Sequence, residues 1–263
     1  MDLGLSNKKA LVTGASRGLG YAAARGLALE GAEVAINSRD QGRIEQAAKG
    51  LASETGVSIH PFAADLSSPA EIEKLVPQAV EKMGGLDLLI TNAGGPPAGV
   101  FENFDEQTWQ QAIDLSFLSH VRLIRAALPA LRKSDVGSVL TITSYSVKQP
   151  IPNLVLSNSV RGATIGLTKT LALELGSDGI RFNSILPGWT ETERVYELMS
   201  YRAETSGTTV EAEIAKQMVN SPLGRMASPD EFANAAVFIV SPAASYITGV
   251  MLTVDGGMYK GTL

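Results

Sequence analysis

Short apolar runs alternate with helical patterns along the whole 263-residue chain, and this alternation constrains the fold more than any other feature. The runs are almost continuously apolar, as is typical of strands covered on both faces. They are Lys9–Gly14, Glu33–Asn37, Val57–Ala63, Leu86–Thr91, Gly137–Thr143, Ile180–Leu186 and Val250–Val254. The helical patterns between them are Leu19–Leu29, Gln41–Glu54, Pro69–Met83, Glu106–Lys133, Asn153–Leu175 and Pro229–Ile239. This order predicts a single doubly wound α/β domain over residues 1–263 with a seven-stranded parallel sheet.

One segment, residues 191–227, interrupts this alternation. It separates the sixth predicted strand from the last helix and has helical pattern without a strand. Because ligands of open α/β sheets bind at the carboxyl ends of the strands, a long excursion from such an end predicts a helical lid over the site. A surface insertion without a role in binding is the alternative.

Composition excludes several classes of protein. Hydrophobic residues make up 44% of the chain, enough for a core, and the net charge of −5 gives no electrostatic reason to expect a nucleic-acid partner. The absence of cysteine excludes disulfides, thiolate metal sites and cysteine nucleophiles. The two histidines, His60 and His120, are far apart in sequence, so we expect no metal site.

The sequence shows no targeting or membrane segment. The N-terminus lacks the order of basic head, apolar stretch and cleavage site that marks a signal peptide. The uncharged stretch Phe232–Val254 is interrupted by Asn234, Pro242 and Gly249, which favours helix, turn and strand over a membrane span. We therefore expect a cytoplasmic protein with no membrane partner.

A glycine-rich loop follows the first predicted strand and opens the first predicted helix. Its glycines are Gly14, Gly18 and Gly20, and Ser16, Arg17 and Leu19 lie between them. Glycines let a backbone approach a pyrophosphate closely, and the helix N-terminus supplies unpaired N–H groups. At the first strand–helix turn, this spacing predicts a dinucleotide-binding domain of the Rossmann type.

The end of the second predicted strand bears on which dinucleotide binds. Ser38 stands where a carboxylate would bind the ribose 2′-hydroxyl, Arg39 follows it, and Arg17 lies in the nearby glycine loop. Two guanidiniums without a carboxylate favour a 2′-phosphate, so we expect NADP(H) in preference to NAD(H). Two ordinary surface arginines beside an indifferent site are the alternative.

The chain resembles the short-chain dehydrogenase/reductase family, in motifs that keep the family's order along nearly its whole length. Besides the glycine loop, Ala64-Asp65-Leu66 is similar to the adenine-contacting segment and Thr91-Asn92-Ala93-Gly94 to the fourth-strand motif. Leu186-Pro187-Gly188, with Thr190 after it, resembles the segment beside the nicotinamide. The resemblance favours the 3-oxoacyl-(acyl carrier protein) reductase-like branch. It implies that Asp65, Leu66, Asn92, Gly94, Pro187, Gly188 and Thr190 contact the cofactor.

The resemblance fails at the catalytic positions. It implies hydride transfer with a tyrosine acid, a lysine four residues later, a serine about thirteen residues earlier and an asparagine on the long helix. Ser144 matches the serine, but Ser157 replaces the tyrosine, Arg161 the lysine and Ser116 the asparagine. The segment Gly162–Thr168 fits the family helix, so the register holds.

These replacements keep a cation and hydroxyls but remove the proton donor. Arg161 could still bind a ribose, and Ser144, Ser157 and Arg161 could bind an oxyanion or a carboxylate without transferring a proton. Another phenol could replace the missing acid. Tyr145, with Lys148 three residues later, is one candidate, and the lid tyrosines Tyr196 and Tyr201 are others.

We therefore expect an NADP(H)-dependent oxidoreductase with an atypical active site that reduces a carbonyl of a small molecule or an acyl thioester, such as a 3-oxoacyl thioester. A catalytically silent NADP(H)-binding protein, acting as a sensor or an assembly subunit, is one alternative. A family member with a reaction that needs no phenol is another. The segment Asn153–Leu175 is apolar over more than one face, which suggests a subunit interface, and the resemblance implies a homotetramer.

Overall fold

The computed structural model describes residues 1–262 and contains, within them, one seven-stranded parallel sheet of order β3-β2-β1-β4-β5-β6-β7. Its strands are β1 (Lys9–Val12), β2 (Glu33–Ser38), β3 (Ile59–Ala63), β4 (Leu88–Thr91), β5 (Ser138–Ile142), β6 (Arg181–Pro187) and β7 (Met251–Val254). Each predicted strand is present, with ends shifted by at most two residues. The doubly wound α/β prediction is confirmed.

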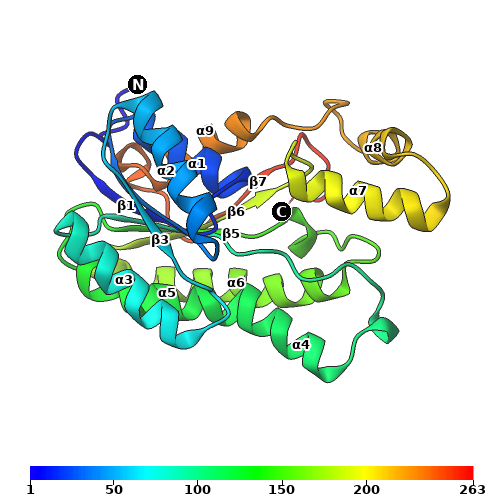
Figure 1. Cartoon of the computed structure of the whole chain (residues 1–263), viewed down its shortest axis with the longest axis horizontal. Helices are drawn as coiled ribbons and strands as arrows, with labels where there is room; N and C mark the ends of the chain where they lie inside the picture. Colours follow the sequence, from blue (N-terminus) through cyan, green and yellow to red (C-terminus); the bar gives the residue numbers. More distant parts are fainter. Residues whose placement is uncertain (263) are drawn as a thin grey trace.

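Helices cover both faces of this sheet (Figure 1). One face carries α1 (Gly18–Leu29), α2 (Gln41–Thr55) and α9 (Pro229–Val240), which bury Leu27, Ile44 and Phe232. The other carries α3 (Pro69–Met83), α5 (Ser119–Leu131) and α6 (Val155–Glu174), which bury Ile72, Leu123 and Ala172. The apolar stripe of each predicted helix accordingly lies in one of two cores that sandwich the sheet.

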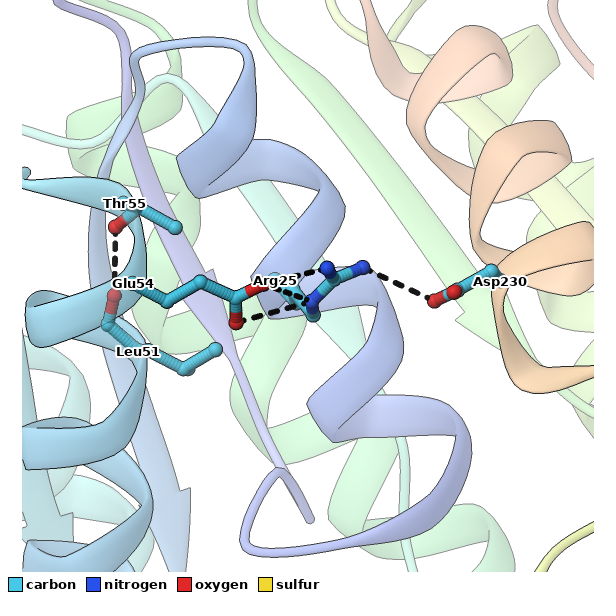
Figure 2. Close-up of polar contacts among 5 residues, drawn as sticks. All are labelled: Arg25, Leu51, Glu54, Thr55 and Asp230. Carbon is cyan, nitrogen blue, oxygen red and sulfur yellow. Dashed lines mark hydrogen bonds and ion pairs between the residues drawn. The ribbon is translucent and has the colours of Figure 1, made fainter.

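Arg25 on α1 links the three helices of the first face. Figure 2 shows its guanidinium between Glu54 of α2 and Asp230 of α9. The Nε atom donates to Glu54 Oε1 at 2.9 Å, and Nη1 donates to Asp230 Oδ1 at 3.3 Å. Beside it, a Cβ on Gly26 would lie 2.8 Å from Val237 Cγ2, so α1 and α9 approach closely because position 26 has no side chain.

The long predicted helix Glu106–Lys133 is interrupted, which corrects the sequence-based expectation. It divides into α4 (Glu106–Ile113), a π-helical turn at Asp114–Leu118 and α5. Such a turn admits one more residue than an α-helical turn and changes the direction of the side chains within it. Here it buries Ser116, one of the candidate catalytic residues, against α6.

The segment of residues 191–227 forms α7 (Glu193–Ser206) and α8 (Val210–Met218), at one end of the sheet (Figure 1). Its base is fixed by a parallel bridge between Thr190 and Ala227. Leu198 and Met199 of α7 pack on Tyr145, which follows β5. The two helices are thereby held over the carboxyl ends of β5 and β6.

The part of the chain that the structure describes has no helix both long and apolar enough to span a membrane. The uncharged stretch Phe232–Val254 consists of α9, a short 3-10 turn at Pro242–Ala244 and β7. Residues 1–262 also contain no group of three or more potential metal-ligating His, Asp or Glu side chains.

Candidate functional site

The glycine loop joins β1 to α1 and forms a cradle that side chains would fill. Gly14 and Gly18 have φ of 58° and 60°, in the left-handed region that favours glycine. A Cβ on Gly20 would lie 2.4 Å from Gly14 O, and one on Gly14 would lie 2.7 Å from Asn92 O. These contacts are too short for any side chain, so only glycine is accommodated at both positions.

This cradle leaves room for an anion at the start of α1. Arg17 is the N-cap of the helix, and a guanidinium, which only donates, cannot cap the N–H groups of the first turn. The N–H groups of that turn, with the positive end of the helix dipole, are therefore available to a phosphate. Ser16 is half-buried in the loop, and Leu19 packs on the core beneath it.

Asn92, at the end of β4, supports the loop from below. Its Nδ2 donates to Gly14 O at 3.1 Å, and its backbone N–H donates to Thr13 Oγ1 at 2.9 Å. Gly94, two residues later, is exposed at the same edge of the sheet. In this structure Asn92 therefore positions the phosphate cradle.

The end of β2 offers a guanidinium without a free carboxylate. Asp40 is the nearest acid, but its Oδ1 accepts from Arg43 N at 2.8 Å and caps α2. Ser38 Oγ donates to Asp40 O at 3.2 Å. Arg39 is exposed and forms no ion pair within residues 1–262. Arg39 is thus one of the two guanidiniums that the sequence predicts at this edge.

Arg17 was expected to face the end of β2, but in the structure its guanidinium contacts α7. Its guanidinium pairs with Glu193 and lies 3.4 Å from Glu197 Oε1, both on α7. The two carboxylates are one helical turn apart and face the glycine loop, so they attract the half-exposed arginine. The sequence could not reveal this contact because it joins segments some 180 residues apart.

The loop after β3 places Asp65 and Leu66 near the end of β2. Asp65 Oδ1 accepts from Ser67 N at 2.8 Å, and its backbone N–H donates to Glu71 Oε2 at 2.7 Å. Leu66 is buried. Asn37, which sequence reasoning missed, fixes this loop because its Nδ2 donates to Ala64 O at 3.1 Å. The adenine-contacting segment of the resemblance is thereby held in an ordered turn.

The end of β6 supplies the residues expected beside a nicotinamide. Pro187 pairs with Val254 in the sheet, and a Cβ on Gly188 would lie 2.7 Å from Asp255 Cα. Thr190 is buried, and its Oγ1 has no hydrogen-bond partner in the described part of the chain. A buried hydroxyl without a partner fits a site that a polar ligand group completes.

Ser144 lies two residues after the end of β5, with its hydroxyl free to donate. Its Oγ accepts from Ser146 N at 3.2 Å and caps the short 3-10 turn Tyr145–Val147. Because this contact uses only a lone pair, the O–H remains available to a carbonyl oxygen. Ser157, in the first turn of α6, is half-buried, and its hydroxyl forms no hydrogen bond among residues 1–262.

Arg161, one turn after Ser157 on α6, is a buried cation with no acidic partner in the described chain. Only 9% of its surface is exposed. Its Nη1 donates to Ile142 O and Thr143 O, each at 3.3 Å, which places the guanidinium beside the residue before Ser144. Burial, with the nearby charge of Arg194, lowers the pKa of Arg161 to about 10, so it is protonated at neutral pH.

Ser116 and His120 are buried behind Arg161. Ser116 Oγ and His120 Nε2 have no hydrogen-bond partner among the residues described, whereas Ser116 O accepts from Thr164 Oγ1 at 3.1 Å. His120 Nδ1 lies 2.7 Å from Thr91 Oγ1. Burial, and secondarily the charge of Arg161, lowers the pKa of His120 to about 3. His120 is therefore neutral and cannot supply a proton.

The structure does not assemble the alternative pair Tyr145 and Lys148. Tyr145 is buried beneath α7, and burial raises the pKa of its phenol. Lys148 Nζ instead lies 5.1 Å above the ring of Tyr259. Tyr196 and Tyr201 of α7 are exposed. Lys148 therefore contacts a different aromatic ring from that of the candidate acid Tyr145.

Sequence reasoning missed three residues of α7 and the turn before it. Thr192 Cγ2 would lie 3.7 Å from a Cβ on Gly18, which brings the lid segment to the glycine loop. Arg194 Nη2 donates to Pro96 O at 3.1 Å, after β4, and Arg202 lies 5.4 Å from the ring centre of Trp189. Residue types alone gave no signal, because the face that α7 presents depends on its docking.

Residues 14–259 match the family model described as Enoyl-(Acyl carrier protein) reductase. The human protein Dehydrogenase/reductase SDR family member 4 is 33% identical, over 96% of this chain and 88% of its own length. The chain belongs to the short-chain dehydrogenase/reductase family.

Other relatives in this family are also oxidoreductases. D-beta-hydroxybutyrate dehydrogenase of Cupriavidus necator is 31% identical, over 96% of this chain and 98% of its own. L-sorbose reductase of Gluconobacter frateurii, solved with NADPH and L-sorbose, has a TM-score of 0.94 and 32% identity, covering 99% and 100% of the two chains. Actinorhodin polyketide ketoreductase, solved with NADPH, has a TM-score of 0.92 and 29% identity, covering 97% of this chain and 98% of its own. This short-chain dehydrogenase/reductase is therefore similar to carbonyl-reducing oxidoreductases.

Proposed function

We propose that this protein is an NADP(H)-dependent reductase of carbonyl compounds that works without a tyrosine acid. The observation that carries the proposal is the coexistence of an intact phosphate cradle at Gly14 and Gly20 with a buried, unpaired Arg161 beside Ser144. The similar reductases solved with NADPH support it. We also infer a cytoplasmic homotetramer, supported by the apolar surface of α6, where Leu173 is exposed.

The residues present fit this cofactor. The cradle of Gly14, Ser16, Gly18, Leu19 and Gly20 suits the pyrophosphate, and Ser38 with Arg39 suits the 2′-phosphate. The adenine would lie by Asp65 and Leu66, and the nicotinamide by Pro187, Gly188 and Thr190, with Gly94 and Arg161 near its ribose. When bound, the reduced nicotinamide supplies a hydride. The preference for the phosphorylated form rests on Arg39 and on the use of Asp40 as a helix cap.

The catalytic residues act on the developing oxyanion. The free hydroxyl of Ser144 donates to the carbonyl oxygen, and the Arg161 guanidinium stabilises the negative charge in a site of low dielectric constant. Neither Ser157 nor Arg161 releases a proton near neutrality, so water that reaches the half-buried serines supplies it. The substrate is a small carbonyl compound, and a 3-oxoacyl thioester is the candidate that the family resemblance implies.

A silent NADP(H)-binding sensor or assembly subunit is the second candidate function. The position of Lys148 above Tyr259 favours it, because Tyr145 is left without a lysine to lower its pKa. Turnover separates the two functions, since both require cofactor binding and only the reductase oxidises NADPH.

The test combines cofactor titration with turnover. Fluorescence titration should show NADPH binding at least about tenfold tighter than NADH, and Arg39→Met should remove this preference. Gly20→Ala should abolish NADPH binding, whereas Gly50→Ala, at an exposed position of α2, should leave it unchanged. NADPH oxidation with 3-oxoacyl thioesters and simple ketones should be measurable.

A double substitution tests the altered centre directly. Ser157→Tyr with Arg161→Lys should raise the rate of ketone reduction by about 10²–10⁴, because it provides a general acid. Absence of NADPH binding would overturn the proposal. Tight binding without oxidation of NADPH by any carbonyl compound would favour the silent protein.

A further inference from the structure

Two arginines from different elements meet at Gly95, in the loop after β4. A Cβ on Gly95 would lie 3.5 Å from both Nε and Nη2 of Arg194 and 3.8 Å from Nη2 of Arg161. Arg161 comes from α6, whereas Arg194 comes from the start of α7. The α7 segment therefore brings a second guanidinium to the buried cation beside Ser144.

Charge around this pair is incompletely compensated. Arg161 has no acidic partner within residues 1–262, and its Nη2 forms no hydrogen bond there. Arg194 lies 3.8 Å from Glu197 Oε2, but Arg17 shares that carboxylate. With Glu193 paired to Arg17, three guanidiniums face two carboxylates. The proximity of Arg194 contributes to the lowered pKa of Arg161, as expected for two like charges.

An uncompensated buried cation is costly, and a second cation beside it adds repulsion. An anion between the two guanidiniums would remove both penalties. Planar guanidiniums bind a carboxylate through charge-assisted hydrogen bonds, and the glycine at position 95 leaves the space between them free of a side chain. The free hydroxyl of Ser144 lies one residue beyond the carbonyl that Arg161 contacts.

We propose that Arg161 and Arg194 together bind the carboxylate of an oxo acid, so that the substrate is a free acid whose carboxylate lies close to the carbonyl group being reduced. This inference rests on the proposed carbonyl reduction and specifies the class of substrate that is reduced. The carbonyl carbon gains the hydride that the reduced cofactor supplies, its oxygen gains a proton from water, and the product is the corresponding hydroxy acid. A thioester has no such charge and leaves the charges of Arg161 and Arg194 without an anion between them.

The first test compares acids with their neutral esters. Pyruvate, acetoacetate and phenylpyruvate are each assayed against the methyl ester with NADPH, and calorimetry follows binding of the acids to the NADP⁺-loaded protein. At least one acid should exceed its ester in kcat/KM by about tenfold or more. Arg194→Met should raise the KM of that acid at least about tenfold without changing the ester, and Arg194→Lys should restore part of the loss.

Arg132→Met is the matched control for this test. Like Arg194, Arg132 forms an ion pair and has a half-exposed side chain, with exposed fractions of 48% for Arg132 and 51% for Arg194. Arg132 differs in position, because it lies on the surface after α5. Its substitution should alter neither acid nor ester. Equal rates for acids and esters in the wild type, or equal loss of both in Arg194→Met, would overturn the proposal. Stronger competition by inorganic phosphate than by any acid would also overturn it, in favour of a phosphate.

A second test needs neither substrate nor turnover. Gly95→Asp places a carboxylate between the guanidiniums, and Gly95→Asn places a neutral group of the same shape there. The aspartate variant should melt about 2–4 °C above the asparagine variant and should bind no oxo acid. The difference should vanish when Arg194→Met is combined with each. An aspartate variant that melts no higher than the asparagine variant would contradict the anion site. This result does not depend on the cofactor, so it is separate from a failure of NADPH binding, which would overturn the proposed function.

Discussion

Arg161 and Arg181 are equally buried, each 9% exposed, yet their surroundings differ completely. Arg181, on β6, donates four hydrogen bonds of 2.8–3.2 Å to Ile239 O, Ile247 O, Val240 O and Ser241 O, at the end of α9 and before β7. Within residues 1–262, Arg161 forms two hydrogen bonds, each of 3.3 Å. Burial lowers the pKa of both to about 10.

This comparison shows that burial alone does not identify a functional cation. The carbonyls at the C-terminal end of α9 carry the negative end of the helix dipole, and with Ile247 O they accept four hydrogen bonds from Arg181. Arg161 retains unused donors, faces a second arginine and lies beside a free serine hydroxyl. Remaining hydrogen-bonding capacity, rather than burial, distinguishes Arg161, for which we propose a binding role, from the structural Arg181.

The largest effect should follow loss of Arg181. Arg181→Met removes four hydrogen bonds to backbone carbonyls, so we expect a loss of at least about 3 kcal/mol in the free energy of unfolding. Arg161→Met should cost less than half as much, because its contacts are long and its charge is unpaired. Thermal and urea unfolding of both variants measure this. Equal losses would contradict the distinction between the two sites.

Enzymatic activity should depend more on Arg161 than on Arg181, the reverse of the order expected for stability. Arg161→Met should lower kcat about 10²–10³-fold by removing the charge that stabilises the oxyanion. Steady-state kinetics with a carbonyl substrate and saturating NADPH provide the measurement. A conservative Arg181→Lys protein that remains folded serves as the control and should keep kcat within a few fold. Full activity in Arg161→Met would assign Arg161 to structure.

The pH dependence of stability tests the surroundings of Arg161, because the buried His120 lies behind it and is affected by its charge. Its folded pKa, about 3, is below the unfolded value of 6.5, so the unfolded chain binds more protons below pH 6.5. The contribution of His120 to stability is complete above that pH and falls as pH decreases toward 3. We expect a loss of about 2 kcal/mol between pH 6.5 and 5. His120→Gln should flatten this part of the profile of melting temperature against pH; an unchanged slope would exclude His120 as its source.

The smallest effect concerns Arg17, which is exposed, in contrast to the buried Arg161 and Arg181. Its side chain is 48% exposed, and water screens its pairs with Glu193 and Glu197. Glu197→Gln should change the free energy of unfolding by less than about 1 kcal/mol. It should strengthen NADPH binding by up to a few fold at low salt, because Arg17 becomes freer to meet a phosphate. Titrations at two salt concentrations test this, and weaker binding at both would contradict it.

Local sequence signals predicted which residues the fold brings together at the proposed cofactor site. The glycine loop, Asn92, Ser38 and Arg39 each lie at the carboxyl end of a strand, and a parallel sheet places such ends along one edge. The interrupted helix at Ser116 was missed, because a π-helical turn leaves the apolar pattern almost unchanged. The register that placed Ser157 and Arg161 one turn apart on α6 agrees with the structure.

The sequence by itself determined the order of strands and helices, the position of the glycine loop and the places of Ser157 and Arg161 one turn apart on α6. These follow from apolar periodicity and from residues that are neighbours in the chain. Only the tertiary structure decided that Arg194 meets Arg161 at Gly95, that Arg17 pairs with α7 and that Lys148 lies over Tyr259. Contacts between distant elements depend on how each helix docks and which face it presents, and the residue pattern of one element does not specify the side chains of another.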